Sequence, residues 1–169
     1  MPIAGSDIQI RLSGGAANSD PNASIGGAKS SVQVVDASLH NLFDIVSSAE
    51  SLAGDIEYRL IYVHNAHATL SLQNAVAWIQ TQTPDTQTSA DIGVAAAAVN
   101  ATETAIANEN TAPASVSFSA PAVEGSALPL GTLPAGQHRG LWIRRTINAG
   151  AAAFNTDSVV IRIKGDTAA

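Results

Sequence analysis

Apolar and polar residues alternate with a period of two along much of the chain, the pattern of a strand with one buried face. The clearest example is 55–65, whose first half alternates charged and apolar residues and whose second half is apolar on both sides. We therefore expect a strand whose second half is covered on both faces, by a loop or by another subunit. Its alternating residues are Asp55, Glu57 and Arg59 on one side and Ile56, Tyr58, Leu60 and Tyr62 on the other.

Shorter segments with a strand pattern recur between clusters of Gly, Pro, Asn and Asp. We expect 69–81 to pair with 55–65 as a hairpin, and 158–164 to pair with 138–147. The remaining strand candidates are 7–12, 32–34, 116–118 and, with a helix as the alternative, 91–98.

One segment, 38–53, has a helical spacing of apolar residues. Ser38 is suited to begin such a helix and Gly54 to end it, but three serines weaken it, so helix and loop both stay open.

Seven or eight short strands without a βαβ rhythm predict an all-β fold, an antiparallel β-sandwich of the Ig-like or jelly-roll kind. We expect one domain over 1–169, with long loops or arms at 13–27 and 99–114. The apolar sides of the best-patterned strands give the expected core residues: Leu60, Tyr62, Leu72, Trp78, Ile143 and Ile161.

Charge and composition exclude several classes of function. The chain has 8 Lys and Arg against 14 Asp and Glu, for a net charge of −6, which is unlike a nucleic-acid binder. It has no cysteine, which excludes a disulfide framework, a thiolate zinc site and a cysteine nucleophile. The amino terminus lacks the pattern of a signal peptide and the longest apolar run, 92–99, is too short to span a membrane, so we expect a soluble protein that binds no membrane.

No motif predicts an enzyme or a cofactor. The chain lacks the Gly-x-Ser-x-Gly motif of serine hydrolases. Asp55 and Glu57 resemble an acid–base pair, but Arg59 follows on the same side, so a solvated ladder of charges is the favoured interpretation. His64 and His67 lack further metal ligands nearby in sequence, and turn or interface histidines are favoured over a metal site.

Basic residues gather near the carboxyl end. From Arg139 onward the chain has five basic and two acidic side chains, against three and twelve before it. Alternation places Trp142 beside Arg144 on one strand and Arg162 beside Lys164 on another, with their apolar neighbours on the opposite faces. Together with Arg139, these residues form a candidate partner interface that docks by charge complementarity. The alternative is a solvated outer face with Trp142 under an arginine stem.

Four blocks of the sequence resemble a group of small virion structural proteins of tailed bacteriophages. The blocks are 7–27, Leu39-His-Asn-Leu-Phe-Asp-Ile-Val46, Glu57-Tyr-Arg-Leu-Ile-Tyr-Val-His-Asn65, and Pro134-Ala-Gly-Gln-His138 with Trp142-Ile-Arg-Arg145. The similarity extends from about residue 7 to about residue 166 and includes no catalytic motif.

The resemblance implies a capsid decoration (cement) protein on the outer surface of the virion. Such a protein binds the major capsid protein and its own sister copies, as a dimer or trimer at a symmetry axis. The long loops would then be arms that become ordered against a neighbour. A neck, tail or baseplate part is an alternative. Another is a carbohydrate-binding β-sandwich of a receptor-binding fibre, which would stack sugars on Trp142, Trp78 or Tyr62.

Overall fold

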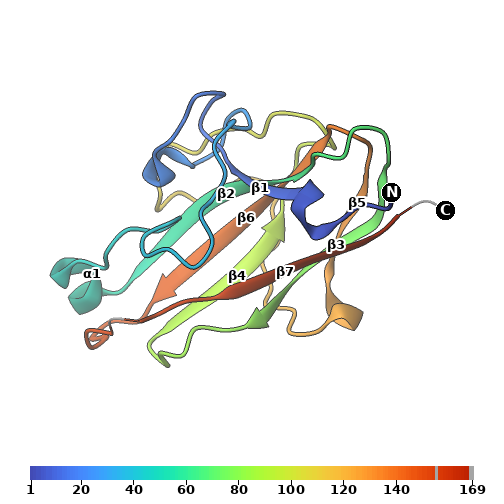
Figure 1. The fold of residues 1–169 in the computed structure, drawn as a ribbon. Helices are drawn as coiled ribbons and strands as arrows, with labels where there is room; N and C mark the ends of the chain where they lie inside the picture. Colours follow the sequence, from blue (N-terminus) through green and yellow to red (C-terminus); the bar gives the residue numbers. More distant parts are fainter. Residues whose placement is uncertain (155, 168–169) are drawn as a thin grey trace.

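Two antiparallel sheets pack face to face in the computed structural model, which describes residues 1–154 and 156–167 (Figure 1). The larger sheet has the strand order β1-β2-β6-β4 and the smaller has β5-β3-β7, so the all-β sandwich predicted from the sequence is confirmed. The described strands are β1 (Ile8–Leu12), β2 (Asp55–Asn65), β3 (Leu72–Thr81), β4 (Thr88–Val94), β5 (Leu128–Leu133), β6 (His138–Ile147) and β7 (Val160–Thr167). Among the described residues, helix is confined to α1 (Ser48–Ala53) and the single 3₁₀ turns η1 (Gly5–Asp7), η2 (Pro21–Ala23) and η3 (Glu124–Ser126). No helix in the described part of the chain has the length and apolar character needed to cross a membrane.

Both predicted strand pairings are wrong. β2 and β3 belong to different sheets, and so do β6 and β7. The side chain of Asn65, fully buried at the end of β2, donates to the carbonyl oxygens of Leu70 at 2.8 Å and Leu133 at 2.9 Å. These bonds hold the chain at a corner where it passes from one sheet to the other. In the predicted hairpin the chain would instead have turned back to pair with β2. β6 instead lies between β2 and β4 and pairs with both.

The main core lies between the two sheets. It contains Leu72 and Ile143, as expected, and Ile161 is partly buried against it. From β2 the core receives Ile61 and Val63, the opposite side of the strand from the predicted Leu60 and Tyr62.

A second apolar cluster covers the outer face of the larger sheet. Leu60, Tyr62 and Trp142 are fully buried there. The covering residues come from loops that precede β5: Ile106, Val116 and Phe118. The expectation that the second half of β2 is covered on both faces is therefore confirmed, and a loop of the same chain provides the outer cover. Trp78 is buried as well, but belongs to neither cluster.

The two long loops pack on each other and on the sheet edge. Gly27 N–H donates to Glu103 O at 2.9 Å, and Ile106 N–H donates to Ile25 O at 2.9 Å. Beyond the end of β1, Leu60 N–H donates to Ser24 O at 2.7 Å and so satisfies the open edge of β2. Both loops therefore have hydrogen-bond partners within the chain, and the expectation that 13–27 and 99–114 are arms ordered against a neighbour stays a prediction.

The predicted helix is much shorter than the pattern suggested. α1 begins after Ser47, whose Oγ accepts from Glu50 N–H while the Glu50 carboxylate accepts from Ser47 N–H. It ends at Gly54, as expected, where φ is +78°. The stretch 38–47 is irregular, and the positive φ of 54° at His40 is incompatible with a helix begun at Ser38.

Candidate functional site

Five charged side chains meet beneath the irregular stretch 38–47, on the inner face of the larger sheet. We call them the buried ionic cluster: Asp44, Glu57, Arg59, Glu109 and Arg145. Glu57 and Arg59 are both fully buried, so the prediction of a solvated ladder is wrong for these two residues. Local alternation could not reveal this burial, because the partners that permit it come from elsewhere in the chain.

Each arginine of the buried ionic cluster has a carboxylate and an aromatic partner. Arg145 pairs with Glu57 and donates to the backbone oxygen of Asp44 at 2.9 Å, while Arg59 pairs with Glu109. The ring of Phe43 lies 4.8 Å from the Arg145 guanidinium carbon and 5.4 Å from that of Arg59. This cation–π arrangement anchors 38–47 to the sheet.

Charge in the buried ionic cluster is nearly balanced. Carboxylate oxygens of Asp44, Glu57 and Glu109 lie within 4.8 Å of one another, and the two guanidinium groups supply the compensating positive charge. Burial raises the pKa of Glu57 above its usual value, and the bond from Arg145 opposes that shift. The chemistry of this arrangement is structural: it holds a loop on the sheet.

A tyrosine and a histidine organise the loop end of the larger sheet. The Tyr62 hydroxyl donates to Gly27 O at 2.7 Å and accepts from Glu103 N–H at 2.9 Å. The imidazole of His138 packs edge-on against the Tyr62 ring, with centroids 4.7 Å apart. Burial, and then the nearby charges of Lys29 and His64, lower the pKa of His138 to about 4. His138 is therefore neutral near pH 7.

The two histidines proposed as turn or interface residues have separate backbone partners. His64 Nε2 lies 3.1 Å from Gly136 O, and His67 Nδ1 accepts from the N–H groups of Thr69 and Leu70. Both rings contribute to the corner that follows β2.

The candidate interface residues on β6 point mainly to partners within the chain. Trp142 is fully buried, and Arg139 donates to the carbonyl oxygens of Ala95 and Ala97. Arg144 binds one oxygen of Asp91 through Nε at 3.1 Å and Nη2 at 2.7 Å, and lies over the Phe118 ring. The bond to Asp91 raises the pKa of Arg144 above its usual value.

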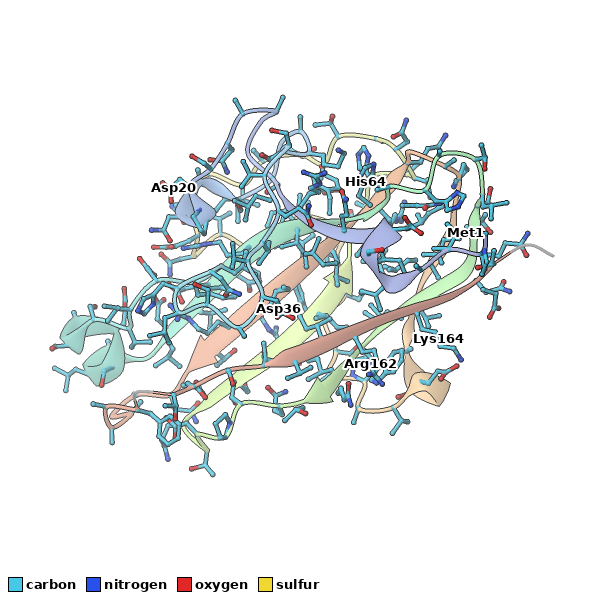
Figure 2. The ribbon with its side chains drawn as sticks, viewed as in Figure 1. Met1, Asp20, Asp36, His64, Arg162 and Lys164 are labelled. Carbon is cyan, nitrogen blue, oxygen red and sulfur yellow. The ribbon has the colours of Figure 1, made fainter. Side chains whose placement is uncertain are left out.

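The other two candidate interface residues lie on the second sheet. Arg162 and Lys164 are exposed on β7 (Figure 2). Lys164 pairs with Glu124, and Arg162 makes no ion pair within residues 1–154 and 156–167. Because β6 and β7 belong to different sheets, the five residues do not form one basic surface, and that part of the prediction is wrong.

The three aromatic residues that we considered for stacking against a sugar are covered by other residues. Tyr62 and Trp142 are fully buried and Trp78 is 7% exposed. A sugar-stacking platform needs an exposed ring face, so none of the three residues can serve as one in this structure.

Sequence reasoning missed the exposure of several apolar side chains between β1 and β2. Among the described residues, nine large hydrophobic side chains are exposed, and five of them lie within 35–56, which we call the apolar segment: Val35, Leu39, Ile45, Leu52 and Ile56. Beside Ile56 is an open hollow of about 520 Å³, lined also by Gly54, Asn110 and Ile147. The apolar residues of 38–53 were visible in the sequence, but a regular helix over this stretch would have buried them in the core.

Two carboxylates of the apolar segment reach solvent. Asp36 is exposed and the Asp44 side chain is 48% exposed, while Arg145, which lies near Asp44, belongs to the buried ionic cluster. Exposed apolar side chains with polar neighbours are typical of a protein–protein contact.

A comparison with known proteins finds no relative of this chain. No family model, no curated protein and no solved structure matches the chain.

Proposed function

We propose that this chain is a structural protein of a bacteriophage virion, a decoration protein that binds the major capsid protein on the outside of the head. It acts there through surface contacts alone, together with sister copies at a symmetry axis. The single observation that carries the proposal is the apolar segment, which exposes five large hydrophobic side chains within 22 residues.

The sequence resemblance supports this assignment at the same place. One of its four blocks, Leu39–Val46, lies within the apolar segment. Inside this block, Leu42 and Phe43 face the sandwich, whereas Leu39 is 73% and Ile45 69% exposed. The block therefore has an anchoring side and an outward apolar side, which suits attachment to another protein.

The anchoring explains how an irregular segment can serve as a rigid contact. Phe43 lies against the guanidinium groups of both Arg59 and Arg145, and Arg145 also binds the Asp44 backbone. A surface ordered before binding loses less conformational entropy when it binds. Many such contacts, repeated by the symmetry of a capsid, give strong attachment from modest individual affinities.

The test is attachment to phage heads that lack the protein. Purified wild type is added to such heads and its occupancy is measured against concentration. The variant Leu39→Ser/Ile45→Ser removes two exposed apolar side chains that a partner would bury. We expect it to lose about 3 kcal/mol of binding free energy, or roughly a hundredfold in affinity.

The matched control is Val123→Ser, which removes an exposed apolar side chain outside the apolar segment. It should attach like wild type, and all three proteins should unfold at similar urea concentrations. Equal attachment of Leu39→Ser/Ile45→Ser and wild type would remove the apolar segment from the proposal. Failure of wild type to attach to any head would overturn the proposal itself.

A further inference from the structure

The free edge of β7 differs from the other sheet edges of the sandwich. Residues 30–34 cover β1, since Leu12 N–H donates to Val32 O and Val34 N–H donates to Ile10 O. Ser119 covers β4 through two backbone bonds with Ile92, of 2.8 and 3.0 Å.

The strand β5, at the other edge of the smaller sheet, has an irregular backbone. In β5, Pro129 lacks an N–H group and Gly131 has a φ of +88°, and the pairing with β3 shifts register between them. Irregularities of this kind prevent an edge from accepting another strand.

β7 is not covered in the described part of the chain, and the two register shifts in its pairing with β3 place the extra residues on β3, not on β7. It pairs with β3 on one side, and no backbone hydrogen bond joins its other side to residues 1–154 or 156–159. No residue of β7 is buried, and its inward residues Ile161 and Ile163 are only partly covered. An edge strand directs alternate N–H and C=O groups outward, where they are available to a further strand.

The side chains of β7 indicate the charge of its partner. Arg162 and Lys164 share the outer face, with Ile163 between them in sequence (Figure 2). Arg162 has no ion-pair partner among the described residues, and Lys164 has only the exposed Glu124. A cross-strand partner opposite these positions is favoured when it carries carboxylates.

A second copy of β7 fits this edge poorly. An antiparallel pair centred on Ile163 places Arg162 of each copy opposite Lys164 of the other. A pair centred on Arg162 or Lys164 places identical cations opposite one another, which is destabilising. A pair centred on Gly165 leaves only residues 163–167 in the ladder.

We propose that β7 is a docking edge for an extended segment of a partner protein in which acidic and apolar residues alternate. The segment adds a strand to the smaller sheet, with its carboxylates opposite Arg162 and Lys164 on the outer face. Its apolar side chains lie beside Ile161 and Ile163 and complete their burial. This docking edge is separate from the apolar segment and does not depend on the proposed function.

The experiment uses the full chain and synthetic nine-residue peptides. The probe is a fluorescein-labelled peptide of alternating valine and glutamate, and its binding is followed by fluorescence anisotropy. One control peptide has lysine in place of glutamate. A second keeps the glutamates but is N-methylated at every residue, which removes the donors needed for strand pairing. Hydrogen exchange of residues 160–167 is measured with and without each peptide.

We expect only the unmodified acidic peptide to bind and to slow exchange in β7. The variant Arg162→Glu should weaken its binding about tenfold, since an exposed attraction becomes a repulsion. The control Thr132→Glu/Ala114→Glu makes the same change in net charge at exposed positions outside β7 and should bind more tightly than Arg162→Glu. Thr132 lies on β5, the opposite edge of the same sheet.

Several outcomes overturn the proposal. One is the absence of binding at about 1 mM peptide. Another is equal binding of the lysine or N-methylated peptide, which would show that strand pairing with an acidic segment is not the interaction. A third is binding without slower exchange in β7. Sedimentation of the chain alone as a dimer with a protected β7 would assign the edge to a second copy.

Discussion

Glu57→Gln should destabilise the protein strongly although it changes only one charge. The carboxylate is fully buried and is the main partner of Arg145, whose side chain is 15% exposed. Removing one member of a buried ion pair costs 3–5 kcal/mol, because the other charge stays buried without compensation. Arg145 keeps the Asp44 carboxylate at 3.5 Å and the Asp44 carbonyl at 2.9 Å, so we expect the lower end, about 3 kcal/mol.

The assay is urea unfolding at pH 7, followed by tryptophan fluorescence and circular dichroism. The matched control is Glu124→Gln, which removes the partner of Lys164 in an exposed pair and should leave the unfolding midpoint unchanged. The variant Glu57→Leu/Arg145→Met removes both buried charges and should recover most of the stability lost by Glu57→Gln.

Two results would refute this reasoning. If Glu57→Gln and Glu124→Gln shift the midpoint equally, the charge at residue 57 is not buried as described. If Glu57→Leu/Arg145→Met is less stable than Glu57→Gln, the loss in Glu57→Gln does not arise from an uncompensated Arg145.

Two further predictions concern the loop end of the larger sheet. The pKa of His138 is about 4 in the folded chain and about 6.5 when unfolded, so the unfolded chain binds more protons between these values and stability falls as pH drops from 6.5 to 4. Between pH 6.5 and pH 4, the free energy of unfolding should fall by about 2 kcal/mol more in wild type than in His138→Gln. Urea unfolding at several pH values measures this difference, and an equal fall in both proteins would contradict the low pKa of His138. At Gly26, φ is +111° and an added Cβ would lie 2.4 Å from the Cα of Ala105, so Gly26→Ala should cost more than about 2 kcal/mol. Gly15→Ala has a similar φ of +120° but open space, and should cost only about 1 kcal/mol in the same thermal or urea assay; equal losses would show that the close approach is unimportant.

Strand positions were predictable where alternation was strong. The bounds of β2 and β6 coincide with the predicted 55–65 and 138–147. β5 was missed because Pro129 and Gly131 are typical of turns, although both are tolerated in an edge strand. Which strands pair was not predictable, since alternation gives the faces of a strand but not its neighbours.

The candidate interface was predictable in its charges but not in its geometry. Alternation placed Arg144 and Trp142 on one face of β6 correctly, yet a loop from elsewhere in the chain covers Trp142. Arg162 is exposed as expected. Burial of Glu57 was hidden for the same reason as that of Trp142: the covering groups are distant in sequence, and only the folded chain brings them near.

The central place of β6 in the larger sheet affects how the chain folds. β2 finds its long ladder only with β6, where Asp55 pairs with Ile147 and His64 with His138, and β4 depends on the same strand. Paired residues of β2 and β6 are therefore 74 to 92 positions apart, and those of β4 and β6 are 47 to 59 apart, so loop closure must precede the gain from pairing. The larger sheet cannot form before β6 has emerged from the ribosome, so β2 and β4 of the nascent chain lack this partner strand until late in synthesis. Folding on the millisecond-to-second timescale after release is the expected consequence.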